Sequence, residues 1–177
     1  MLLKIDVTPG FDCRKSCAYH RSLMSGALHS WYSLPDLRSL AERGAVLEGE
    51  LELAKLVRLR DLLNSSEGHA WGQLSFRLHN GDMLVMALKC EARLELVCQR
   101  CLEPVAHEVC EQVDFAVAEN EDSLALLPQG MDLIALEGDR LQPAALIEDE
   151  LIVSLPLVPK HGDENIEETN NGCPKEP

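Results

Sequence analysis

A long run of alternating apolar residues, ending in two closely spaced cysteines, constrains the fold of this chain more than any other stretch. Charged residues such as Lys89 and Arg93 fill the later positions between the apolar ones. A period of two is typical of a β-strand with one buried and one solvated face. A strand of this length must twist or bulge. The apolar positions are Leu84, Met86, Leu88, Cys90, Ala92, Leu94, Leu96 and Cys98.

A second alternating strand is predicted directly after the cysteines, beginning at Pro104. The two strands form a hairpin whose exposed tip, residues 98–104 (the hairpin tip), carries a Cys-x-x-Cys motif. Upstream, Asn80-Gly81 is a strong hairpin signal and joins the long strand to an earlier one over residues 71–78. The inward positions of the second strand are Val105, His107, Val109, Val113, Phe115 and Val117. We expect Cys90 and His107 to be core or edge residues rather than ligands.

Helices and shorter strands are predicted on both sides of this hairpin. Ser33 and Asp36 resemble a capping box, so a helix is expected from Ser33 to a stop at Gly44. A strand follows over 45–54, then helical spacing over 56–63, a loop over 118–131 and a short strand over 132–136. Pro143 begins a last helix, with Glu148, Asp149 and Glu150 largely away from its apolar face (Ala144, Ile147, Leu151 and Leu155). The class is α+β, with an antiparallel, strongly twisted or barrel-like sheet and a few helices.

We predict one domain with two less ordered ends. Residues 1–30 are a poorly patterned extension, residues 31–160 the single α+β domain, and residues 161–177 a flexible, disordered acidic tail. The weak patterning of the extension suggests Met24 as an alternative start. Within it, Cys13, Cys17 and His20 have a spacing that suits metal ligands on a helix, although no apolar stripe supports that helix.

The net charge of −14 is concentrated in one half of the chain. Residues 1–102 hold 13 Lys and Arg against 12 Asp and Glu, whereas residues 103–177 hold 3 against 18. An acidic half repels phosphate backbones and attracts basic proteins, although a plain solubilising role is the simpler alternative. We therefore expect a basic protein partner, leave direct RNA binding open, and name Arg100, Glu148, Asp149 and Glu150 as candidate partner-binding residues. No apolar run reaches membrane-spanning length and no signal peptide is evident, which favours the cytoplasm.

The Cys-x-x-Cys motif at a hairpin turn is one half of a zinc site, since the turn places both sulfurs on one side. Cys98 and Cys101 are thus candidate ligands, and His161 and Cys173 are candidates for the other half. A redox role would require the motif at a helix N-terminus, where the dipole lowers a thiol pKa. Unligated structural cysteines are the third alternative. With no catalytic motif, phosphate loop or nucleophile elbow, the sequence indicates a structural or binding role without a small-molecule substrate.

Two separated motifs give a family resemblance. Residues 96–104 (LVCQRCLEP) and 147–161 (IEDELIVSLPLVPKH) resemble the YceD family, and the resemblance extends over roughly residues 35–162. It implies a non-enzymatic role in synthesis, processing or stability of large-subunit ribosomal RNA. It also implies a second ligand pair after the Pro-x-x-Pro element. His161 matches its first member, and Cys173 lies further on than is usual in the family. The alternatives are a zinc-dependent or redox protein and an acidic carrier of a basic protein.

Overall fold

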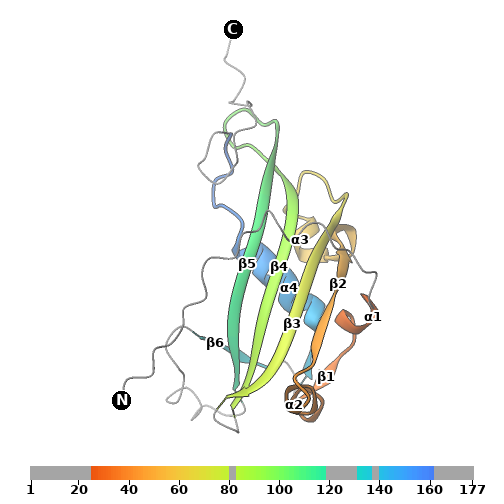
Figure 1. The fold of residues 1–177 in the computed structure, drawn as a ribbon. Helices are drawn as coiled ribbons and strands as arrows, with labels where there is room; N and C mark the ends of the chain where they lie inside the picture. Colours follow the sequence, from red (N-terminus) through yellow and green to blue (C-terminus); the bar gives the residue numbers. More distant parts are fainter. Residues whose placement is uncertain (1–24, 80–82, 119–130, 137–139, 162–177) are drawn as a thin grey trace, which may run out of the picture.

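The structure, a computed structural model, describes residues 25–79, 83–118, 131–136 and 140–161. Within these ranges, a five-stranded sheet is accompanied by short helices and by one longer helix packed on its inner face (Figure 1). The elements are α1 Ser25–Leu28, β1 Tyr32–Ser33, α2 Leu34–Glu42, β2 Val46–Glu52, η2 Leu53–Lys55, α3 Val57–Arg60, β3 His69–His79, β4 Met83–Val97, β5 Pro104–Ala118, β6 Asp132–Ala135, β7 Arg140–Leu141 and α4 Pro143–Val153.

The main sheet has the strand order β2-β3-β4-β5-β6. Its first three pairings are antiparallel, and β6 joins β5 in parallel. The predicted long hairpin is confirmed, since β4 and β5 pair from Val85 opposite Ala116 to Val97 opposite Pro104. The sheet is open, with β2 and β6 as its edges, so the barrel-like alternative is not adopted. A separate two-stranded sheet pairs β1 with β7.

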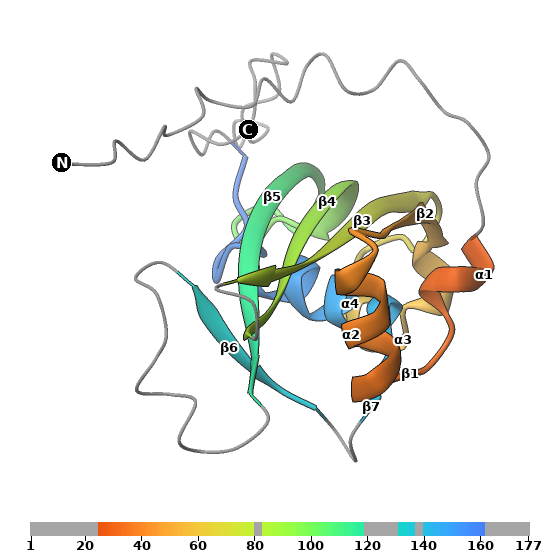
Figure 2. The same cartoon turned by 60° about the horizontal axis from the view of Figure 1, so that its bottom comes forward.

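One face of the sheet carries the hydrophobic core, and α4 covers it (Figure 2). The alternation read from the sequence is correct, because Leu84, Met86, Leu88 and Leu94 of β4 are buried. Cys90 is fully buried among them, as predicted. Burial raises the pKa of its thiol to about 12, which keeps that thiol protonated and unreactive.

Helix α2, the first helix that the sequence predicts, is delimited by the predicted signals. The Asp36 carboxylate accepts hydrogen bonds from the Ser33 backbone N–H and hydroxyl, at 2.9 and 2.6 Å. At the other end, Gly44 adopts φ +58° and its N–H donates to the Ala41 carbonyl. The Ala45 N–H donates to the Leu40 carbonyl, which completes a Schellman motif.

Two details differ from the sequence prediction. The helical spacing over 56–63 produces only the single turn of α3, whose first backbone N–H groups donate to the Glu148 carboxylate of α4. Leu28, in the segment predicted to be poorly patterned, is fully buried in the core. The loop over 118–131, the extension before residue 25 and the tail after His161 lie almost entirely outside the described residues.

Candidate metal centre at the hairpin tip

The hairpin tip folds back on itself through two backbone hydrogen bonds. The Cys98 N–H donates to the Glu103 carbonyl at 3.0 Å, and the Leu102 N–H donates to the Cys98 carbonyl at 2.9 Å. Closing this turn places Leu102 at φ +62°, in the left-handed region. The Cys-x-x-Cys motif therefore lies between two strands, as predicted, and not at a helix N-terminus.

The chain returns to this tip after α4, through residues 154–161 (the return segment). The Ser154 carbonyl lies 3.3 Å from His107 Nε2, so His107 anchors the start of the segment. Further along, the Gln99 N–H donates to the Pro159 carbonyl at 2.9 Å. His161 Nε2 lies 3.1 Å from the Pro104 carbonyl. These contacts hold the return segment against the hairpin tip over a sequence separation of about sixty residues.

Three potential metal ligands meet where the two segments touch. Cys101 Sγ lies 3.3 Å from His161 Nδ1. Together with Cys98 Sγ, these ligand atoms all lie within 4.8 Å of one another. The carbonyl of Pro104 accepts the Nε2 proton of His161, which leaves the Nδ1 lone pair directed at the thiols. Such an outer hydrogen bond is the usual way in which proteins orient a metal-binding histidine.

Cys98 is fully buried, whereas the sequence predicted an exposed tip. The return segment covers it, and the small cluster of Leu96, Cys98 and Val105 packs against Leu155. Burial opposes ionisation of the thiol, but backbone N–H groups of Cys101, Arg100 and His161 outweigh it. They lower the Cys98 pKa to about 5. A thiolate held by backbone N–H groups is the form that binds a metal ion.

The four predicted ligands thus have different outcomes. The structure brings Cys98, Cys101 and His161 together into a cluster that can hold a metal ion. Cys173 lies outside the described residues, as do Cys13, Cys17 and His20. The donor set of two thiolates and an imidazole suits zinc, which prefers sulfur and nitrogen ligands in tetrahedral sites.

The predicted orientation of Glu148 is wrong. Its side chain is buried on the inner side of α4, where one carboxylate oxygen accepts the backbone N–H groups of Arg58 and Leu59 at 2.7 and 3.1 Å. The other oxygen accepts from the Arg58 guanidinium at 3.1 Å. Sequence periodicity missed this role because the partner groups belong to a segment about ninety residues earlier. Glu148 is therefore an internal anchor for α3.

The neighbouring acidic residues remain accessible. Asp149 is exposed and pairs with Arg58, and Glu150 is half-buried. Burial, together with the charges of Glu111 and Asp132, raises the pKa of the Glu150 carboxyl. Negative charges from α4, β5 and β6 thus gather on one side of the sheet. Arg100, the remaining candidate for partner binding, is exposed in the hairpin tip.

Comparison with known proteins identifies the family. The sequence model described as "Large ribosomal RNA subunit accumulation protein YceD" matches residues 86–177. The protein of that name from Haemophilus influenzae is 30% identical over 128 residues, which cover 72% of this chain and 74% of the relative. The chain belongs to the YceD family. The YceD match begins within β4 and includes the hairpin tip, α4, the return segment and Cys173. No solved structure matches this YceD chain.

Among the described residues, none of the helices is both long and apolar enough to cross a lipid bilayer. The longest of them, α4, spans only Pro143–Val153 and carries three acidic residues.

Proposed function

We propose that this chain supports the accumulation of large-subunit ribosomal RNA as a non-catalytic factor in ribosome biogenesis. The observation that carries the proposal is membership of the YceD family, whose description names that process. The cytoplasm, where bacterial ribosomes assemble, is the proposed place of action. The factor would act on the synthesis, processing or stability of the RNA.

A binding role fits the chemistry of the cysteine cluster better than catalysis. Cys98 has no exposed surface, and His161 is oriented by a backbone carbonyl. A metal held by three thiolates and an imidazole leaves no coordination position for a substrate. We assign Cys98, Cys101 and His161 as zinc ligands, with Cys173 as the fourth. Zinc, when bound, would supply a cross-link between the hairpin tip and the return segment.

The proposed partner is a basic ribosomal protein or a pre-large-subunit particle. Asp149 and Glu150 are accessible on α4, and Glu111 and Asp132 add to the negative charge beside Glu150. Such a surface attracts a basic protein and disfavours direct contact with phosphates. Glu148 is excluded from this surface because it is buried. Arg100, exposed at the hairpin tip, remains a candidate contact to the partner.

Density-gradient sedimentation of extracts from a strain depleted of this protein tests the function. Wild-type protein should restore large-subunit ribosomal RNA and co-migrate with pre-large-subunit particles. A variant combining Asp149→Asn and Glu150→Gln should co-migrate with these particles less than wild-type protein does as salt is raised. Glu67→Gln, which changes an exposed carboxylate in a loop, is the matched control and should behave as the wild type does. A normal level of large-subunit ribosomal RNA in the depleted strain would refute the proposal. Restored RNA without co-migration would instead favour a carrier of a free basic protein.

A further inference from the structure

The sulfur atoms of Cys98 and Cys101 lie close together within one turn of the chain. The Cys101 side chain hydrogen-bonds to the Cys98 sulfur, and the ligand atoms of the cluster all lie within 4.8 Å of one another. The two ends of a four-residue turn have Cα atoms less than about 7 Å apart. A disulfide spans Cα separations of roughly 4.4–6.8 Å, so this turn can close into one with little movement of the backbone.

The two cysteines differ in their access to solvent. Cys98 has no exposed surface, whereas Cys101 is partly exposed. A small oxidant such as hydrogen peroxide therefore reaches Cys101 first. Backbone N–H groups of Arg100 and Cys101 donate to the Cys98 sulfur and stabilise its thiolate beside Cys101. The exposed sulfur is thus suited to meet the oxidant, and the buried sulfur is suited to attack the exposed one afterwards.

The other two cysteines in the described part of the chain lack this arrangement. Cys90 is buried in the core. Cys110 is exposed, but it lies opposite Glu91 in the β4–β5 pairing rather than opposite another cysteine. These two residues serve as internal comparisons for the reactivity of the hairpin tip.

We propose that Cys98 and Cys101 form a reversible, regulatory disulfide on exposure to a peroxide. In the metal-binding form both sulfurs are thiolates. The Cys101 thiolate attacks one oxygen of hydrogen peroxide, which breaks the O–O bond, leaves a sulfenic acid at Cys101 and releases hydroxide. The Cys98 thiolate then attacks the Cys101 sulfur, which forms the S–S bond and expels a second hydroxide. Solvent protons convert both hydroxides to water, so the two sulfurs lose two electrons and one peroxide gains them.

The disulfide would separate the return segment from the hairpin tip. Its sulfurs are no longer thiolates and so no longer metal ligands, and His161 loses its sulfur partners. Closing the sulfurs to about 2.05 Å also reshapes the turn that holds Gln99, whose N–H donates to the Pro159 carbonyl. This inference rests on the zinc assignment within the proposed function and names the regulation of that site.

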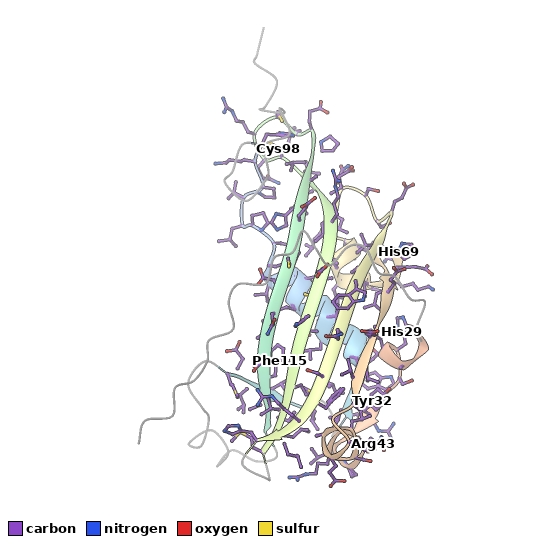
Figure 3. All side chains as sticks on the ribbon, in the orientation of Figure 1. His29, Tyr32, Arg43, His69, Cys98 and Phe115 are labelled. Atoms are coloured by element: carbon purple, nitrogen blue, oxygen red, sulfur yellow. The ribbon has the colours of Figure 1, made fainter. Side chains whose placement is uncertain are left out.

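The rest of the fold should tolerate this change. Cys98 belongs to a small apolar cluster separate from the larger core, and it marks the end of the sheet opposite to Arg43 (Figure 3). In a reducing compartment such a disulfide is transient, because thiol reductants reverse it by exchange. Oxidation would therefore act as a reversible switch at the tip and leave the core folded.

Titration of purified, full-length, zinc-loaded protein with hydrogen peroxide tests the proposal. A chromogenic chelator should report stoichiometric zinc release, and dithiothreitol should restore zinc binding. Mass spectrometry without reduction should find Cys98 linked to Cys101. Trypsin cleaves after Arg100 and glutamyl endopeptidase after Glu103, so these cuts separate the two cysteines from each other and from Cys110. Zinc loss without this disulfide, a disulfide from Cys101 to another cysteine, or the disulfide with zinc retained would each overturn the proposal.

Two single variants test the order of the steps. Cys98→Ser leaves Cys101 without the second thiol, so a sulfenic acid should accumulate at Cys101 and react with dimedone. Cys101→Ser should leave Cys98 unlabelled, because Cys98 is buried. Cys110→Ser is the matched control and should form the disulfide and release zinc as wild-type protein does. Dimedone labelling of Cys98 in preference to Cys101 would contradict the proposed order.

Amide hydrogen exchange followed by NMR tests the release of the return segment in the wild-type protein. The Gln99 amide should lose protection on oxidation and regain it on reduction with zinc present. The Ala45 amide, which donates to the Leu40 carbonyl at 2.9 Å near Arg43, should keep its protection and serves as the control. Unchanged protection of Gln99 in protein that carries the disulfide would refute the release.

Purified protein separates this inference from the proposed function. If the reduced protein binds zinc but peroxide forms no disulfide, the switch is refuted while the function stands. If the disulfide forms with zinc release but the depleted strain has normal large-subunit ribosomal RNA, the proposed function fails and the switch stands. Reduced protein that binds no zinc would refute both the zinc assignment and its control by oxidation.

Discussion

Ile147 of α4 lies directly over Gly72 of β3, so closely that the two residues determine how near the helix can approach the sheet. A Cβ atom at position 72 would lie 2.4 Å from Ile147 Cδ1 and 3.0 Å from its Cγ1. Both distances are shorter than a normal contact, and Ile147 is fully buried. The absence of a side chain at Gly72 is therefore what allows α4 to close over the core.

Gly72→Ala should destabilise the protein by about 1–3 kcal/mol, because overpacking forces the helix or its side chains to shift. Urea unfolding measures this change. Ile147→Val removes the nearest methyl group and alone should cost about 0.5–1.5 kcal/mol. Combined with Gly72→Ala, it should cost less than the sum of the single changes. Strictly additive costs would show that the close approach is not the cause.

Glu148→Ala should be more damaging than any other substitution of an acidic residue in α4. It leaves the buried N–H group of Leu59 and the partly buried N–H group of Arg58 without their acceptor, at a cost of about 2–4 kcal/mol. Asp149→Ala is the matched control. It removes an exposed ion pair with the same arginine and should cost about 0–1 kcal/mol. Similar unfolding free energies for the two variants would contradict the anchoring role.

Glu150 should make the protein less stable as pH rises above about 4.5. Burial and the charges of Glu111 and Asp132 raise the pKa of its carboxyl in the folded state above the unfolded value of 4.5. The folded state therefore holds the proton more tightly, and stability falls as pH rises from 4.5 through the folded pKa. Glu150→Gln should remove this decline and stabilise the protein at neutral pH. Urea unfolding between pH 4 and 8 tests this. Glu111→Gln removes one of the charges that raise the Glu150 pKa, so it should narrow the pH range over which stability falls.

Metal removal should loosen the contact between the hairpin tip and the return segment. A chelator should lower the melting temperature of wild-type protein, and Cys98→Ser or His161→Ala should abolish stoichiometric zinc and that response. Cys110→Ser, at an exposed cysteine of β5, should keep both. Because the pKa of the metal-free Cys98 thiol is lowered to about 5, protons do not compete with zinc for this ligand at neutral pH, and zinc should be released only when the pH falls below that value. Elemental analysis across pH measures this, and equal zinc in the Cys98→Ser and wild-type proteins would refute the assignment.

Much of the scaffold was predictable because its signals are local. Alternation along β4, the Asn80-Gly81 signal between the antiparallel strands β3 and β4, the carboxylate of Asp36 and the left-handed Gly44 each act within a few residues. The same holds for the position of the Cys-x-x-Cys motif between two strands. His161 was named as a candidate ligand, together with Cys173, because a zinc site needs more ligands than one cysteine pair, and the family resemblance supported His161, although its spacing from the motif carries no signal.

Tertiary structure alone decided the contacts between distant segments. The sequence determined which residues face inward along each strand, and thereby placed two cysteines at one hairpin tip. It did not determine that β6 joins β5 in parallel, that Glu148 turns inward to Arg58, or that the return segment buries Cys98. Periodicity and capping depend on neighbours within one element. These contacts instead depend on how α4 packs across the sheet, where Gly72 leaves room for Ile147.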